Sequence, residues 1–148
     1  MSREVAKGMT TLPDYVELRA LSNFSFLKGA SHPEELVERA KALGYRALAL
    51  TDECSMAGIV RAHVAAKEHD LPLLVGAQFM VQADLDDAPF SLVLIACNLN
   101  GYGNLCAFIT ALRRASEKGT YYLTRQAVEH ADLMDCVALV SPQRGSSD

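Results

Sequence analysis

Long apolar runs and paired cysteines are both missing from this 148-residue chain. No apolar run is long enough to cross a bilayer, so we expect no membrane partner. Residues Met1–Lys7 lack the apolar core of a signal peptide, which predicts a cytoplasmic location. The four cysteines form no CxxC pair, so a structural zinc site is not expected. Buried free thiols in a reducing cytoplasm are the expected state of Cys54, Cys97, Cys106 and Cys136.

An excess of basic residues is also absent. The chain has 14 Lys and Arg residues against 18 Asp and Glu residues, which gives a net charge of −4. This balance argues against a free-standing nucleic-acid-binding protein, because the affinity of such proteins comes from a basic surface. It leaves open a domain that lies beside a DNA-binding module on a longer chain. Half of the residues are apolar, and the length suits one domain or part of a larger one.

One stretch, Ala47–Gly58, organises the predicted fold. It starts as a short apolar run and ends abruptly in polar residues. This pattern is typical of a buried parallel strand followed by a loop. In parallel α/β folds the functional site lies at the carboxyl ends of the strands. We therefore expect Asp52 and Glu53 at the mouth of a pocket.

Hydrophobic periodicity predicts alternating strands and helices along the chain. We expect strands at residues 15–21, 73–77, 91–97 and 136–141, and a further strand that begins at residue 47. Residues 79–83 either extend the 73–77 strand or pair next to it. Helices are expected at residues 31–43, 55–69, around 105–112 and at 124–130. Right-handed parallel crossovers would build an α/β fold, either a doubly wound sheet or an arc of a barrel. The sequence stops after a strand with no helix to cover it, which indicates a fragment.

Helix ends and buried faces can also be predicted. Ser31 and Glu34 have the spacing of a capping box, Gly44 suits a left-handed residue that closes the first helix, and Thr124 suits an N-cap. The buried side of the second helix is expected to contain Met56, Ile59, Val60, His63, Val64 and Lys67. We expect structural roles for all four histidines: His32 on the surface of a first helical turn, His63 packed on an apolar side, and His69 and His130 near helix ends.

Several motifs, in the right order, resemble the PHP (polymerase and histidinol phosphatase) domain. Residues Leu18–Ala30 resemble its first motif, Ala47–Asp52 with Gly58 its second, and Gly76–Phe79 its third. Asn100–Leu105 is similar to a Gly-Tyr-x-Asn-Leu segment of bacterial DNA polymerase III alpha subunits. Leu21–Leu27 with Ala30–Leu36 is closest to the error-prone, damage-induced branch of that family, which carries out translesion synthesis.

The resemblance implies a distorted β/α barrel of seven repeats, of which this chain holds roughly the first half. The chain would then divide into a flexible lead-in at residues 1–13, the N-terminal part of a PHP domain at 14–141 and a frayed tail at 142–148. It further implies a much longer parent polymerase, whose palm carboxylates lie beyond this chain. Expected partners are the rest of the polymerase and damage-tolerance replication proteins, with DNA contacted only through the parent.

Active members of the family bind a cluster of two or three metal ions, such as zinc or manganese, through His, Asp and Glu. Carried over residue by residue, the ligand positions fall on Arg19, Leu21, Lys28, Asp52, Glu53 and Gln78. Asp52 retains a ligand, and Glu53 could act as one. Leu21 cannot bind a metal, Gln78 is a weak ligand, and Arg19 and Lys28 are cations that would repel one. The resemblance therefore implies a degenerate site, with no metal or other cofactor and no catalytic residues.

Two interpretations of the carboxylates remain open. They form either a remnant metal or phosphate-facing site, or a purely structural pair. In the second case Asp52 bonds the loop or caps the next helix, and Glu53 pairs with Arg19 or Lys28. The leading hypothesis is a non-catalytic module that supports the polymerase core in DNA replication and repair. The alternatives are a metal-dependent phosphoesterase or proofreading exonuclease, and an interaction module that uses the acidic turn 84–87 or the helix around residues 113–114.

Overall fold

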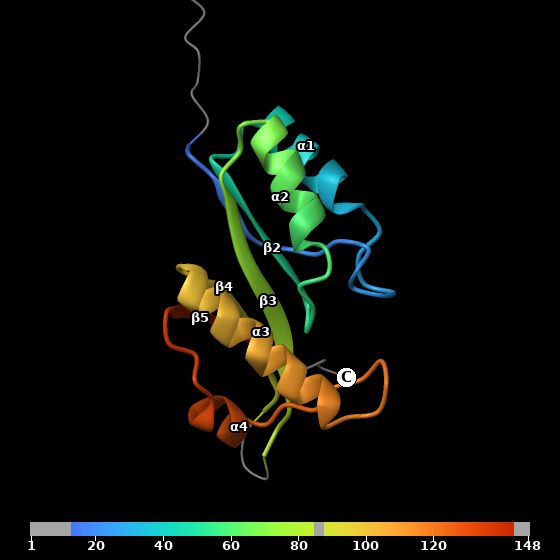
Figure 1. Cartoon of the computed structure of the whole chain (residues 1–148), viewed down its shortest axis with the longest axis vertical. Coiled ribbons are helices and arrows are strands. Elements are labelled where there is room, and N and C mark those ends of the chain that lie inside the picture. Colours follow the sequence, from blue (N-terminus) through green and yellow to red (C-terminus); the bar gives the residue numbers. More distant parts are fainter. Residues whose placement is uncertain (1–12, 85–87, 144–148) are drawn as a thin grey trace, which may run out of the picture.

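The computed structural model describes residues 13–84 and 88–143, which form five strands and four helices (Figure 1). The strands are β1 (Val16–Ala20), β2 (Ala47–Glu53), β3 (Leu73–Val81), β4 (Phe90–Ala96) and β5 (Cys136–Pro142). The helices are α1 (Pro33–Ala42), α2 (Ile59–Glu68), α3 (Leu99–Arg114) and α4 (Arg125–His130). The α/β class is confirmed. The predicted lead-in and tail lie almost entirely outside the described residues, although Pro142 is the last residue of β5.

All five strands form one sheet in the order β1-β2-β3-β4-β5. β1, β2 and β3 pair in parallel, whereas β3 pairs with β4, and β4 with β5, in antiparallel register. The expectation of parallel crossovers is therefore wrong for the second half of the sheet. A parallel crossover needs about a dozen residues or more, and residues 82–89 are too few. β4 must therefore run back beside β3, and β3 continues through Val81 instead of breaking into two strands.

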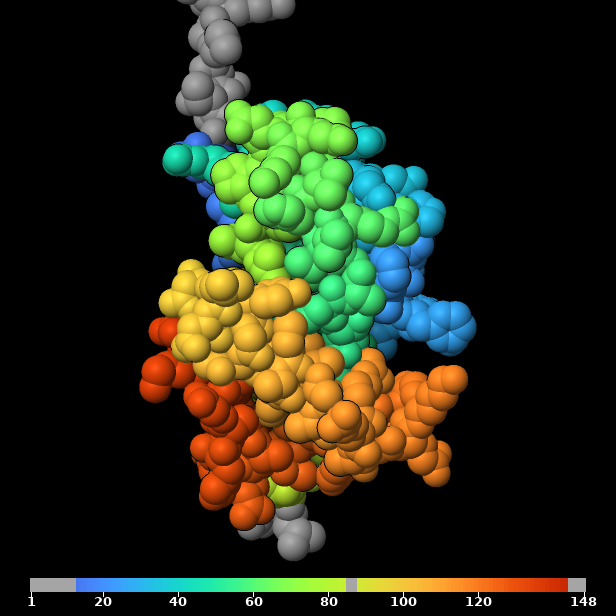
Figure 2. Space-filling view, in the orientation of Figure 1, coloured from blue at the N-terminus to red at the C-terminus, as the bar shows by residue number. Residues whose placement is uncertain are grey.

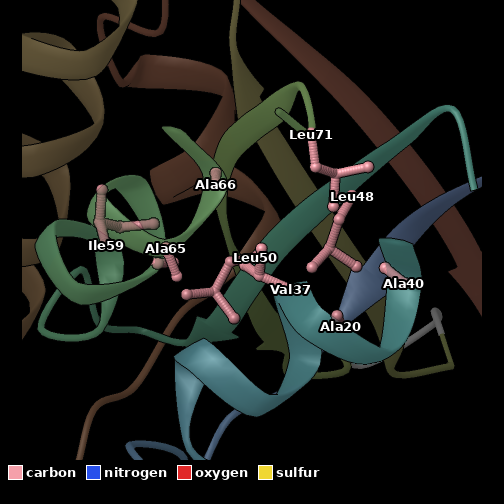
Figure 3. Close-up of a cluster of buried hydrophobic side chains, with 10 residues drawn as sticks. Ala20, Val37, Ala40, Leu48, Leu50, Ile59, Ala65, Ala66 and Leu71 are labelled. Carbon is pink, nitrogen blue, oxygen red and sulfur yellow. The ribbon is translucent and has the colours of Figure 1, made fainter. Parts of the chain in front are cut away.

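Two hydrophobic cores lie between the helices and the sheet. Figure 1 shows α1 and α2 together at one end of the sheet and α3 and α4 at the other. The first core joins Val37 and Ala40 of α1 to Leu48 and Leu50 of β2 and to α2 (Figure 3). The second core places side chains of α3 over β3 and β4, and the Phe79 and Phe108 rings meet edge to face with their centroids 5.3 Å apart.

The buried face of α2 agrees with the prediction at Ile59 and differs from it elsewhere. The buried residues of this helix are Ile59, Ala62, Ala65 and Ala66. Val60 and Val64 are 70% and 52% exposed, and His63 is exposed as well. Both faces have helical spacing, so periodicity alone cannot choose between them. The alanine face allows the helix to approach α1 and the sheet closely, and the larger side chains therefore point outwards.

Helix ends follow the predicted chemistry with one shift of register. α1 has His32 as its N-cap, and the His32 backbone N–H donates to Oε2 of Glu35 at 2.7 Å. The predicted box of Ser31 and Glu34 is thus one residue too early, because Pro33 takes the first helical position. α2 begins four residues later than expected, at Ile59 and not at residue 55.

Two other predicted helix ends are confirmed, and one prediction about the cysteines is wrong. Gly44 has a φ of +75°, and the Thr124 hydroxyl accepts from the Ala127 N–H at 3.1 Å. All four cysteines are free thiols, and Cys54 is buried, but Cys97 is exposed. Among the described helices, none is long and apolar enough to span a membrane.

Candidate functional site

Most of the predicted ligand positions meet at the carboxyl ends of β1, β2 and β3. A hollow of about 180 Å³, called here the Arg19 pocket, is lined by Arg19, Leu21, Lys28, Glu53, Phe79, Gln78, Met80, Ser91 and Gln143. Because the first three strands are parallel, their carboxyl ends lie at the same edge of the sheet. Asp52 does not line this pocket, since neighbouring residues of a strand point to opposite faces.

Asp52 anchors the loop between β1 and α1. Its carboxylate is 2% exposed and accepts three hydrogen bonds of 2.7 Å each. The donors are the backbone N–H and hydroxyl of Ser22 and the hydroxyl of Ser25. Hydrogen bonds to a charged acceptor are roughly twice as strong as neutral ones, so this buried carboxylate fixes the loop firmly. Asp52 therefore bonds the loop, as one interpretation of the sequence suggests, and it does not cap α2.

Glu53 is held by two partners through its two carboxylate oxygens. Lys28 forms an ion pair with Oε2, and the Tyr121 hydroxyl donates to Oε1 at 2.7 Å. The same hydroxyl accepts from the Met80 backbone N–H at 2.7 Å. Burial raises the pKa of Tyr121 well above its ordinary value, and the adjacent Glu53 carboxylate adds to this rise. Tyr121 therefore stays protonated and remains a donor at neutral pH.

Arg113 of α3 closes the other side of the site. Its guanidinium donates to the carbonyl oxygens of Cys54, at 3.1 and 3.2 Å, and of Thr120, at 3.0 Å. It also lies over the Tyr121 ring, 5.5 Å from the centroid. The loop that follows α3 is tied to the end of β2 by these contacts. Arg113 thus uses its donors within the domain, and the interaction surface suggested around residues 113–114 stays a prediction. Most of the other suggested surface, the acidic turn 84–87, lies outside the described residues.

Arg19 bonds to neutral groups and not to Glu53. Its Nε donates to Oε1 of Gln78 at 3.0 Å, and its Nη2 donates to the Ser91 hydroxyl at 2.9 Å. The Gln78 side-chain amide in turn donates to the carbonyl of Thr51 at 2.9 Å. Of the two cations considered as partners of Glu53, the structure selects Lys28.

The residues at the ligand positions do not fit a metal cluster. Both oxygens of Glu53 and both oxygens of Asp52 are already bonded to protein donors. Arg19 and Lys28 place positive charge where the cations would lie. In the part of the chain that the structure describes, no three His, Cys, Asp or Glu side chains are grouped so as to hold a metal ion.

The four histidines lie away from this site. The His32 ring bonds the Asn23 side chain at 3.0 Å, His69 lies 3.7 Å from Glu38, and His130 bonds a carbonyl of its own helix. His63 is exposed, which contradicts the expected packed position. Sequence analysis did not place Ser91, Arg113 or Tyr121 at this site, because they come from distant segments. No motif signal marks them, since their role depends on β4 and α3 folding back over β2.

Comparison with known proteins identifies the family. The PHP domain model matches residues 17–142, and the chain belongs to the PHP domain family. It is 54% identical over 142 residues to the error-prone DNA polymerase of Bordetella parapertussis, which covers 90% of this chain. It is 55% identical over 141 residues to the corresponding protein of Dechloromonas aromatica, with 93% of this chain covered. The predicted resemblance to this polymerase branch is confirmed.

The relatives are much longer than this chain, which spans 14% and 13% of their lengths. Two solved structures share the fold. One is a Bifidobacterium adolescentis protein assigned as a metal-dependent phosphoesterase. It is 25% identical, has a TM-score of 0.58, and the match covers 70% of this chain and 35% of that chain. The other is a Chromobacterium violaceum amidohydrolase solved with sulfate and no metal. It is 27% identical, has a TM-score of 0.55, and the match covers 68% of this chain and 34% of that chain. These matches confirm a partial PHP-type barrel.

Proposed function

We propose that this chain is a metal-free, non-catalytic PHP module that supports the core of an error-prone DNA polymerase during damage-tolerant replication and repair. The observation that carries the proposal is the bonding of Asp52 and Glu53. One carboxylate holds the loop after β1, and the other pairs with Lys28 and Tyr121. Internal cations and hydroxyls thus compensate the charge that metal ions balance in a hydrolytic site.

The relatives support the polymerase context. Error-prone DNA polymerases match at least nine-tenths of this chain at 54% and 55% identity, and each is about seven times longer. A module that spans 13–14% of such a protein is suited to supporting the remaining part. The amidohydrolase neighbour, solved without metal, is consistent with a fold of this kind standing without ions.

A metal-dependent phosphoesterase or exonuclease is the second candidate, and the Bifidobacterium neighbour favours it. The residues at the ligand positions argue against it, because such chemistry needs several ligands that converge on metal ions, which then activate a bound water. Assays of this chain with manganese and with phosphodiester and single-stranded DNA substrates decide between the two. We expect no hydrolysis above the level of a catalytically inert control protein, and turnover that depends on manganese would refute the proposal.

A variant with restored ligands provides the positive control for metal binding. It carries Arg19→His, Leu21→His, Lys28→Glu, Glu53→His and Gln78→Glu, with Asp52 unchanged. We expect this variant to bind manganese or zinc more tightly than the wild-type chain. Equal binding by both chains would show that the substituted positions do not decide metal affinity.

The supporting role has a separate test in the Bordetella parapertussis polymerase. Deleting the residues that correspond to this chain should lower the melting temperature of the remaining protein, because a packed interface would be lost. An unchanged melting temperature would contradict a bracing role. The full-length wild-type polymerase serves as the control, since its interface is intact.

A further inference from the structure

The Arg19 pocket contains a guanidinium that forms no ion pair among the described residues. Arg19 donates through Nε and Nη2 to Gln78 and Ser91, which are both neutral. These two bonds use one edge of the planar fork and fix its orientation. Within the described residues, no acceptor is recorded for Nη1. Arg19 therefore keeps three N–H hydrogens, two on Nη1 and one on Nη2, for a further acceptor.

Two further donors line the same pocket. Lys28 is half exposed, and its ammonium group has three hydrogens, of which the ion pair with Glu53 uses one. Ser91 is 5% exposed and accepts from Arg19, so its own hydroxyl hydrogen can be donated elsewhere. Among the charged side chains that line the pocket, two are cations and one is a carboxylate. The Glu17 carboxylate also lies close by, since it accepts from the Arg19 backbone N–H at 2.8 Å. Such a set of donors suits a small oxyanion with several acceptor oxygens.

A second hollow adjoins the pocket at the Lys28–Glu53 ion pair. It measures about 420 Å³ and is lined by Phe24, Ser25, Phe26, Lys28, Glu53, Arg113, Gly119 and Tyr121. Figure 2 shows the corresponding notch at the right edge, between the projecting blue loop after β1 and the orange segment after α3. Aromatic rings around this hollow provide apolar surface for an organic group. The small cationic pocket and the larger aromatic hollow thus lie side by side.

We propose that the Arg19 pocket binds the phosphate group of a small phosphate-bearing molecule, whose organic part lies in the aromatic hollow. The inference rests on the proposed metal-free state, because the phosphate contacts Arg19, Ser91 and Lys28 and no ion. The pocket volume accommodates a phosphate group but is too small for a nucleoside as well. A phosphomonoester such as a mononucleotide matches both hollows, whereas inorganic phosphate fills only the first.

The test is a titration of the purified chain, in EDTA and at low salt, with sodium phosphate and with deoxyadenosine monophosphate. Binding is followed by calorimetry and by amide shifts of Gln78 and Ser91. We expect both ligands to bind and the affinity to fall as sodium chloride is added. Tighter binding of the nucleotide would assign a role to the aromatic hollow, and equal affinities would limit the site to the phosphate group.

Variants at Arg19 establish the binding residue. Arg19→Gln should weaken phosphate binding about tenfold, and Arg19→Lys, which keeps the charge but not the fork, should give an intermediate affinity. Arg46→Gln is the matched control, because Arg46 is exposed and pairs with Asp14 away from the pocket. Arg19→Gln binding as tightly as the wild type would overturn the inference.

The titration also separates this inference from the proposed function. If neither ligand binds and the protein contains no metal, the inference fails and the metal-free module stands. If phosphate binds only after manganese is added, the metal-free proposal itself fails, and the inference falls with it.

Discussion

Replacing Asp52 tests whether this carboxylate acts as a loop anchor or as a metal ligand. The carboxylate is buried and accepts three hydrogen bonds of 2.7 Å from Ser22 and Ser25. A hydrogen bond to a charged group contributes about 1.5–3 kcal/mol, and neighbouring bonds do not add fully. We therefore expect Asp52→Ala to lower the free energy of unfolding by about 3–5 kcal/mol. Asp52→Asn keeps the shape and one carbonyl acceptor, and should cost about 1–2 kcal/mol.

The assay is urea denaturation followed by circular dichroism, in EDTA and again with manganese. Asp14→Asn is the control, because Asp14 forms an exposed ion pair with Arg46, and it should change stability by less than about 1 kcal/mol. A carboxylate kept for metal binding would be unfavourable without the ion. Asp52→Asn would then be as stable as the wild type, or more stable, in EDTA. This result would refute the role of Asp52 as a loop anchor.

Three other predictions concern the same region and its control positions. Tyr121→Phe removes the hydroxyl that donates to Glu53 and accepts from the Met80 N–H of β3, which should cost about 1–3 kcal/mol in urea denaturation. The pKa of Tyr121 is raised in the folded protein, so its protonated form stabilises the fold below about pH 10. This part of the free energy of unfolding should be lost as the pH rises further. Tyr121→Phe, which has no hydroxyl to titrate, should not show this loss. Burial raises the pKa of the Cys54 thiol to about 11, whereas Cys97 is exposed. Mass spectrometry after iodoacetamide treatment at pH 8 should therefore find Cys97 alkylated well before Cys54. Equal rates of alkylation would contradict the buried position of Cys54. Gly29→Ala should unfold the loop, because its Cβ would lie 2.1 Å from a backbone oxygen, whereas Gly103→Ala, with open space inside α3, should raise the melting temperature.

Local chemistry made much of the fold predictable. Thr124 caps α4 and Gly44 closes the first helix because capping and left-handed backbone depend on a few adjacent residues. The direction of β4 was harder, because strand order depends on pairing between distant segments. The length of the β3–β4 connection was the available signal, and it favours an antiparallel pair. The buried face of α2 could not be predicted, because Val60 and Ala62 lie on different faces of the helix and both faces carry apolar residues at helical spacing.

The candidate site was predictable only where a family motif marks it. Arg19, Lys28 and Glu53 could be placed near one another because Arg19 and Lys28 belong to the first motif and Glu53 follows the second, and both motifs come from neighbouring parallel strands. Tyr121 and Arg113 belong to no motif, and they reach Glu53 and Cys54 only through the path of α3. Their contribution could be found only from the three-dimensional structure.

The metal content of the purified chain tests the central claim most directly. Elemental analysis by mass spectrometry, after expression in medium supplemented with zinc and manganese and without chelator treatment, should find neither metal in stoichiometric amount. One or more equivalents of zinc or manganese per chain, lost in the Asp52→Asn variant, would contradict a site held together by its own side chains.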